Sequence, residues 1–349
     1  MRIHPAIISL LLVAGATRAR AAGEPLQKAL HGAGYKIAYE SYTGGNWEIF
    51  VMNADGTKRR NITRTPNVHE HYPQISPDGT KIAFSVDTGE GRDTVRSLWV
   101  MSISGRHRKK IADHAREPFW APDSQTIGYL NQEYPRFDVV DYYTKGMEFY
   151  DLRTGKTHPH PNSANLHHLY NPGFSPNGKW IVATVHAGMG FDHTILLIEA
   201  RGNRIIDLKI PGCRPRLCLD DKHIAWGPSD HDLAIAPIDL NSDNPVVGPW
   251  SLTITDKVNK IYHIGWSPDG RYVAFSRGPD GEGDLTKKLS FTAANEIVGV
   301  YAGGWNICAV SAQKSGTLDL ATAPPTDFAQ LTTDGDSNKQ PVWFKAREK

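Results

Sequence analysis

The chain has 349 residues, of which 40% are hydrophobic, and its formal net charge is +2. This composition supports a well-packed core, and the length fits either two domains or one closed all-β repeat array. A nearly neutral chain lacks the electrostatic footprint of a nucleic-acid-binding protein. We therefore expect no nucleic-acid partner.

Residues 1–22 have the pattern of a secretory signal peptide. Arg2 supplies the charged start, Pro5–Ala16 is apolar, and Ala19-Arg20-Ala21 offers small residues for cleavage. A membrane anchor is the alternative, but the apolar run is too short to span a bilayer. Loss of the three leader arginines takes the net charge from +2 to about −1. We expect a periplasmic or secreted protein with no membrane span after cleavage.

A tight-turn phrase recurs along the chain, each time between two short strand-like runs. The copies are Ser76-Pro77-Asp78-Gly79, Ala121-Pro122-Asp123-Ser124, Ser175-Pro176-Asn177-Gly178 and Ser267-Pro268-Asp269-Gly270. Proline presets φ, aspartate bonds its own backbone, and glycine adopts the left-handed conformation, so each copy predicts a hairpin. Recurrence at a spacing of ~45 to 55 residues indicates one supersecondary unit copied many times.

Each unit reads as four strands, a to d, with the tight turn between a and b. The second unit shows them most clearly: Tyr72–Ser76, Lys81–Val86, Ser97–Ile103 and Lys109–Ala112. Four further units follow it: Pro118–His158, Asn171–Ile210, Pro215–Thr255 and Ile264–Thr332. In the fifth unit of the chain Leu219-Asp220-Asp221-Lys222 replaces the turn phrase. We expect this blade to depart most from the repeat.

The two ends of the repeat array are incomplete in complementary ways. The first unit begins at its b strand, Lys36–Tyr39, and the chain finishes with a lone a strand, Gln340–Phe344. A ring in which the last strand completes the first blade explains both ends and leaves no exposed sheet edge. The prediction is an all-β, six-bladed β-propeller over residues 36–345, with a lead-in at 23–35 and a tail at 346–349.

The repeat resembles that of TolB-type propellers. The resemblance rests on the turn before Arg60-Asn61-Ile62-Thr63 and on the run from Tyr72 to Phe84. TolB carries an additional N-terminal domain that docks to other envelope proteins. Only Gly23–Gly34 lies between the leader and the first strand, so we expect that domain to be missing. Similar propellers also occur in polysaccharide lyases such as oligogalacturonate lyase, whose site uses histidines at the channel mouth.

Three cysteines are present: Cys213, Cys218 and Cys308. Export permits a disulfide, but the count is odd, and two cysteines in one strand rarely meet the required distance. We expect buried free thiols.

The histidines gather on one face of the predicted ring. The a–b and c–d turns mark a plain face, and the d–a and b–c loops form the opposite, looped face at the channel mouth. Eleven of the thirteen propeller histidines map to the looped face. Loops also carry polar residues for other reasons, so this excess alone does not define a site.

The candidate ligand-binding residues lie just before the a strands, where symmetry would bring them to the axis. They are His69, His71, Arg116, Glu117, His167, His168, Arg214, His263 and Gln340. His69, His71, His167, His168 and His263 are candidate ligands of a divalent metal. A histidine general base beside a cation that neutralises an acidic sugar is an alternative, and simple capping of strand ends is another. No cofactor is required by any motif.

Three functions remain open. The first is an exported propeller that binds a protein or glycan through the looped face. The second is a carbon-oxygen lyase acting on uronate polysaccharide with the His and Arg residues of the channel mouth, and the third is an assembly scaffold. Whether the chain is an enzyme stays undecided at this level. We expect a monomer.

Overall fold

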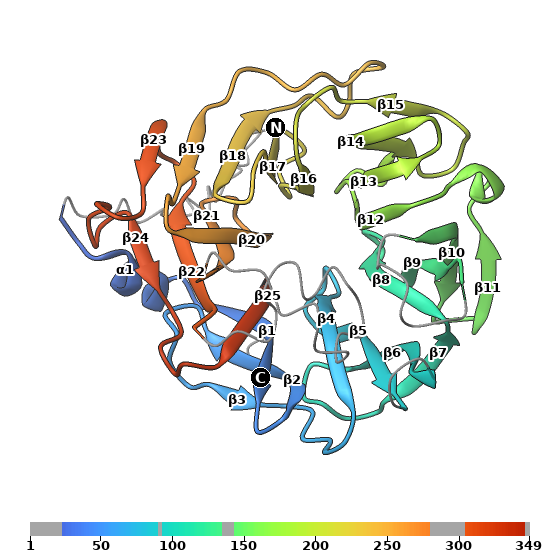
Figure 1. Ribbon diagram of the computed structural model, residues 1–349, viewed down its shortest axis with the longest axis horizontal. Coiled ribbons are helices and arrows are strands. Elements are labelled where there is room, and N and C mark those ends of the chain that lie inside the picture. The colour runs from blue at the N-terminus through green and yellow to red at the C-terminus, as the bar shows by residue number, and fades with distance from the viewer. Residues whose placement is uncertain (1–22, 90–92, 135–142, 280–303, 346–349) are drawn as a thin grey trace, which may run out of the picture.

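The computed structural model describes residues 23–89, 93–134, 143–279 and 304–345. Six sheets stand around a central channel (Figure 1), which confirms the predicted six-bladed propeller. The expected leader, the tail at 346–349 and most of a long loop within the sixth unit lie outside the described residues.

In each blade the first-named strand below lines the channel, and the following strands lie progressively further out. Blade one comprises β25 (Ser337–Lys345), β1 (Tyr35–Thr43), β2 (Asn46–Asn53) and β3 (Arg60–Asn61). Blade two comprises β4 (His69–Ile75), β5 (Lys81–Thr88), β6 (Val95–Ser102) and β7 (Lys109–Asp113). Blade three comprises β8 (Ala115–Trp120), β9 (Thr126–Gln132), β10 (Thr144–Asp151) and β11 (Lys156–Pro159).

The remaining blades follow the same plan. The short 3-10 helix η2 (Ser163–Asn165) leads into blade four, which comprises β12 (Leu169–Phe174), β13 (Trp180–Gly188), β14 (Phe191–Glu199) and β15 (Ile205–Asp207). Blade five comprises β16 (Cys213–Leu217), β17 (His223–Gly227), β18 (Asp232–Pro237) and β19 (Leu252–Thr255). Blade six comprises β20 (Asn259–Trp266), β21 (Tyr272–Pro279), β22 (Asn306–Ser311) and β24 (Phe328–Gln330).

The ring closes through the last strand, as predicted. β25 pairs antiparallel with β1, with Phe344 opposite Lys36 and Val342 opposite Ala38. The indole of Trp343 stacks on the ring of Tyr272 in blade six, with centroids 6.3 Å apart and planes at 18°. The closing strand therefore completes blade one and also packs against the preceding blade.

The fifth blade does depart from the repeat, through a strand supplied by its neighbour. β23 (Gly316–Asp319) belongs to the segment between the c and d strands of blade six. It pairs parallel with β19, Leu252 opposite Gly316 and Thr255 opposite Asp319. This exchange covers the outer edge of blade five and links two blades by backbone hydrogen bonds.

The lead-in forms a short helix, which the sequence reading did not predict. α1 (Leu26–Gly32) buries Leu26 and Leu30 against the core between blades six and one. Gln27 donates a hydrogen bond to the Asp55 carbonyl, and His31 Nδ1 lies 2.5 Å from the Asp55 carboxylate. Within the part of the chain that the structure describes, no helix is long and apolar enough to cross a membrane.

The three cysteines are free and buried, which confirms the thiol prediction. Burial raises the pKa of Cys218 and of Cys308 to about 12. These thiols are therefore packing residues rather than nucleophiles at neutral pH.

Candidate functional site

The channel is lined by six β-bulges, one in each innermost strand. Each interrupts the pairing of the a and b strands near the looped face. One residue of each bulge has a positive φ: Tyr72 (51°), Glu117 (52°), Asn171 (49°), Arg214 (60°), His263 (56°) and Gln340 (55°). Such residues are uncommon outside glycine, and they concentrate at functional positions.

A repeated proline accompanies the bulges. In five of the six strands the positive-φ residue precedes a proline: Pro73, Pro118, Pro172, Pro215 and Pro341. Proline cannot donate to the sheet, so it is confined to edges and bulges. Because the channel side of the innermost strand is an edge, the proline terminates pairing there without leaving a buried donor.

The bulges correct one part of the sequence alignment of the blades. His167 and His168 are not equivalent to Glu117, Arg214 or His263. The matching bulge residue of blade four is Asn171, three positions after His168. The proline that lies three residues before three of the four turn phrases, including that of blade four, could have revealed this register.

His263 lies in a positively charged part of the channel. Its Nδ1 is 3.2 Å from the Ser276 hydroxyl. Burial lowers the pKa of His263 well below its usual value, and the charges of Lys339, Arg214 and Arg216 lower it further. The imidazole is therefore neutral at neutral pH, in surroundings that favour an anion.

Lys339, beside the bulge residue Gln340, is a buried cation with 1% of its surface exposed. Its Nζ lies 4.6 Å from the centre of the Trp305 ring and 5.8 Å from that of Trp47. Nζ has no hydrogen-bond partner among the described residues. Burial lowers the pKa of Lys339 to about 7, while the charge of Glu40, which faces it across the β1–β25 pair, opposes this change. The amine is therefore only partly charged at neutral pH.

The bulges of blades one and two are tied together by a polar network. Glu40 accepts a hydrogen bond from the Tyr72 backbone N–H at 2.7 Å. His71 Nε2 lies 3.4 Å from Asp87, which also receives two hydrogen bonds of 2.7 Å from Arg96. The His71 ring stacks on His69 with centroids 6.0 Å apart. These groups hold the mouth of the channel in a fixed geometry.

Arg116 and Glu117 come from blade three. Arg116 is 2% exposed, so it is part of the channel wall rather than its surface. Burial lowers the pKa of Arg216 in blade five, and the charge of Glu117 opposes this lowering. Arg216 Nη1 also donates to the Pro172 carbonyl at 3.3 Å. Blades three, four and five thus meet around Arg216.

His167 and His168 form a separate group at the rim. His168 Nε2 lies 2.9 Å from the Glu133 carboxylate, and its Nδ1 lies 2.8 Å from the Ala187 carbonyl. His167 Nε2 lies 3.1 Å from the Ala164 carbonyl. Their partners lie in β13, in η2 and just after β9.

The five histidines expected as metal ligands are not assembled into one site. Among residues 23–89, 93–134, 143–279 and 304–345 no group of three or more His, Cys, Asp or Glu side chains is arranged to hold a metal. His69 pairs with His71 and His167 lies beside His168, whereas His263 sits among cations. Positive neighbours disfavour a metal cation there and favour an anion.

Sequence reasoning missed four charged residues that shape the site: Glu40, Asp87, Arg96 and Arg216. The first three lie on b or c strands, and none precedes an a strand. A signal was nevertheless present, because charged residues inside otherwise apolar strand runs are rarely buried unless they are paired.

Comparison with known proteins agrees with this repeat. No protein-family model matches the chain. The Tol-Pal system protein TolB of Francisella tularensis subsp. tularensis (strain WY96-3418) is 26% identical over 153 residues, covering 43% of this chain and 32% of the relative. TolB of F. tularensis subsp. mediasiatica (strain FSC147) is likewise 26% identical over 165 residues. The repeat is of the TolB type. The chain spans about a third of the length of these curated relatives.

Solved structures support the same fold. TolB from Acinetobacter baumannii superposes with a TM-score of 0.60 at 15% identity, covering 88% of this chain and 66% of that one. Kuenenia stuttgartiensis hydrazine synthase gives a TM-score of 0.56 at 11% identity, covering 91% and 47%. A chain of a nidogen/laminin complex gives 0.54 at 10% identity, covering 89% and 98%. At these identities the likeness concerns the fold alone, so this TolB-like propeller owes its function to its own site.

Proposed function

We propose that this TolB-like propeller is an exported binding protein that holds an acidic protein or glycan at the looped face of its channel. The observation that carries the proposal is the gathering of Arg214, Arg216 and Lys339 around His263, offset in part by Asp230, which lies 3.8 Å from Arg214 Nη2. The three basic side chains come from blades one and five and surround a residue of blade six, and a few convergent polar groups are what fix a ligand's orientation in a binding site.

The bulges favour ligand binding over simple strand capping. Six positive-φ positions recur at one level of the channel, and backbone strain of this kind persists where the surrounding structure over-determines it, often at ligand-binding positions. Anions gain from a low-dielectric site whose positive groups are already in place. No contact in the site favours the lyase alternative over binding.

Titration calorimetry with two probes tests the proposal: a glutamate-rich peptide and polygalacturonate. We expect at least one to bind, with affinity that falls as salt concentration rises. Arg214→Gln should weaken binding about tenfold, which is about 1.4 kcal/mol. Arg106→Gln, which removes an exposed arginine from a plain-face turn, is the matched control and should bind as the wild type does.

The two probes also separate the candidate ligands. Binding of the peptide alone indicates a protein partner, and binding of the polysaccharide alone indicates a glycan. Release of an unsaturated product from the polysaccharide would support the lyase alternative instead. Failure of both probes to bind would contradict the proposal.

A further inference from the structure

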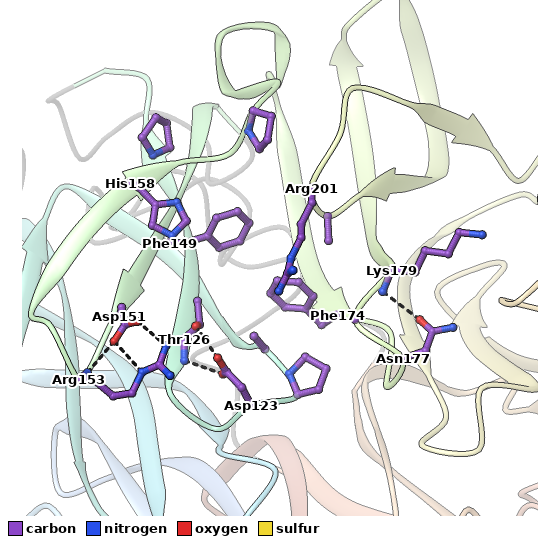
Figure 2. A pocket seen from close by; sticks show the side chains of 16 residues that line it. Asp123, Thr126, Phe149, Asp151, Arg153, His158, Phe174, Asn177, Lys179 and Arg201 are labelled. Atoms are coloured by element: carbon purple, nitrogen blue, oxygen red, sulfur yellow. Dashed lines mark hydrogen bonds and ion pairs between the residues drawn. The ribbon is translucent and has the colours of Figure 1, made fainter.

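The plain face, opposite the proposed site, holds a cavity of about 740 Å³ between blades three and four. Its wall is formed by turn residues of both blades, among them Pro122, Asp123, Arg153 and Arg201. Figure 2 shows Asp123, Arg153 and Arg201 around one opening, with Phe149 and Phe174 inside it. The six bulge residues of the channel have no part in lining this cavity.

The repeat itself explains why space is left here. Blade four begins its b strand with Trp180, whose Nε1 donates to the Leu240 carbonyl of blade five at 3.1 Å. Blade six has Tyr272 at the same position, stacked on Trp343 of the next blade. Blade three has Thr126 there, and Thr126 lines the cavity. A threonine leaves unfilled the volume that a large ring occupies at the junctions that follow blades four and six.

The interior of the cavity is aromatic. The rings of Phe149 and Phe174 lie with centroids 5.8 Å apart. Phe119 lies behind them, 5.3 Å from Phe174 and 6.5 Å from Phe149. The imidazole of His158 is 5.6 Å from the Phe149 ring at the opening. Offset and tilted rings at these distances are suited to receiving another planar ring.

The two carboxylates of the cavity wall, Asp123 and Asp151, already accept hydrogen bonds from neighbouring groups. Burial alone would raise the pKa of Asp123, but hydrogen bonds from the backbone N–H groups of Gln125 and Thr126 lower it. The Arg153 side chain lowers the pKa of Asp151 to about 2, with one hydrogen bond of 2.7 Å. Asp151 therefore neutralises Arg153.

Arg201 is the cation that remains. It lies on the turn after β14, lines the cavity and is exposed. Its guanidinium makes no hydrogen bond or ion pair with the described residues, and Figure 2 shows it reaching into the opening. Lys179, by contrast, directs its ammonium group away from the cavity in the same view. A planar guanidinium with unused donors matches a carboxylate in two-point geometry.

We propose that this cavity binds an aromatic carboxylate, with the ring against Phe149 and Phe174 and the carboxylate on Arg201. We infer this ligand class because the interior of the cavity is apolar and Arg201, at its rim, has no ionic partner among the described residues. The same chemistry is presented by a free aromatic acid and by the C-terminal residue of a peptide that ends in phenylalanine. The site is independent of the proposed function on the other face.

A matched ligand pair tests the proposal. N-acetylphenylalanine and N-acetylphenylalaninamide share the ring and differ in the carboxylate. Ligand-observed NMR titrations of the full chain should show the acid binding about tenfold more tightly than the amide. Equal affinities, or no binding of either compound, would overturn the proposal.

Three variants locate the binding. Thr126→Trp places at blade three the residue that blade four has at this position, and it should abolish binding of the acid. Arg201→Gln should remove the difference between acid and amide, and because Arg201 is an exposed turn residue this variant should fold normally. Arg106→Gln should bind as the wild type does. Unchanged acid binding in both Thr126→Trp and Arg201→Gln would place the ligand elsewhere and overturn the proposal.

A peptide ending in phenylalanine separates the two sources of the ligand. Tighter binding of the peptide than of N-acetylphenylalanine supports a chain terminus, whereas equal affinities support a free aromatic acid. Both results support an aromatic carboxylate as the ligand, provided that Thr126→Trp abolishes binding of the peptide and of N-acetylphenylalanine.

Discussion

The guanidinium of Arg214 lies over the ring of Tyr262, with Cζ 3.8 Å from the ring centre. Arg214 comes from the bulge of blade five, and Tyr262 lies next to the bulge of blade six. The stacking orients one cation of the channel mouth, whose Nη2 also lies 3.8 Å from the Asp230 carboxylate. A cation that is already oriented loses less freedom when a ligand binds.

A double-mutant cycle on Arg214 and Tyr262 should measure this contact. We expect Arg214→Met and Tyr262→Leu to show a coupling energy of about 1–2 kcal/mol in urea unfolding, as for partly desolvated cation–π pairs. Lys109 and Tyr150 provide a control pair, 5.3 Å apart near the surface. Their coupling should be about 0.5 kcal/mol. Equal coupling in the two pairs would argue against an oriented Arg214.

Ring closure should depend on Trp343. The side chain is 6% exposed and stacks on Tyr272, so Trp343→Ala should lower the free energy of unfolding by about 3–5 kcal/mol. Val246 is 72% exposed, and Val246→Ala should change it by less than about 0.5 kcal/mol. Chemical denaturation measures both. A small effect of Trp343→Ala would mean that the closing strand contributes little to stability.

Stability in acid should depend on Asp87. Burial alone would raise the pKa of this carboxyl, but the charge and hydrogen bonds of Arg96 lower it well below the ordinary range. Its contribution is therefore complete above the unfolded pKa of about 4 and is lost as the pH falls further. Asp87→Asn should cost about 3–5 kcal/mol at neutral pH because it leaves Arg96 buried without its charge partner.

Unfolding measured between pH values of about 7 and 2 checks this expectation. The wild type should lose stability steeply below pH of about 4, and Asp87→Asn should show a smaller loss. Asp113→Asn is the control, because Asp113 pairs with Lys110 at 2.9 Å on the surface. That variant should differ by less than about 1 kcal/mol. Identical acid profiles for wild type and Asp87→Asn would contradict the assignment.

The exchanged strand β23 should protect the outer edge of blade five. Leu318→Pro removes a backbone donor from β23, and proline is poorly tolerated inside a paired strand. Hydrogen exchange should then accelerate at Leu252–Thr255, which pair with β23, while the inner strand Cys213–Leu217 keeps its protection. Unchanged exchange at Leu252–Thr255 would show that the parallel pair adds no protection.

The turn phrases predicted most of the fold. Their spacing predicted six blades, and the unmatched runs at Lys36 and Phe344 predicted closure by the last strand, which the β25–β1 pair confirms. The parallel strand β23 was not predictable in the same way. Its sequence, Gly316–Asp319, has no turn phrase, and its partner lies in another blade.

The candidate site was predicted only in part. Placing residues before the a strands identified Arg214 and His263, which the structure brings into one positive region. It also selected His167 and His168, because histidine content was used in place of the proline register that marks Asn171. Position before the last a strand marks Lys339, but its partner Glu40 lies near the other end of the chain, so local spacing gives no signal for their pairing.

Amide hydrogen exchange in the presence of an acidic ligand is the most direct test of the central claim. A glutamate-rich peptide or polygalacturonate, whichever binds, is added to the full chain and its footprint is mapped. We expect protection at the bulge segments around Tyr72, Arg214 and His263. Protection confined to the plain-face turns, or none at saturating ligand, would contradict the central claim.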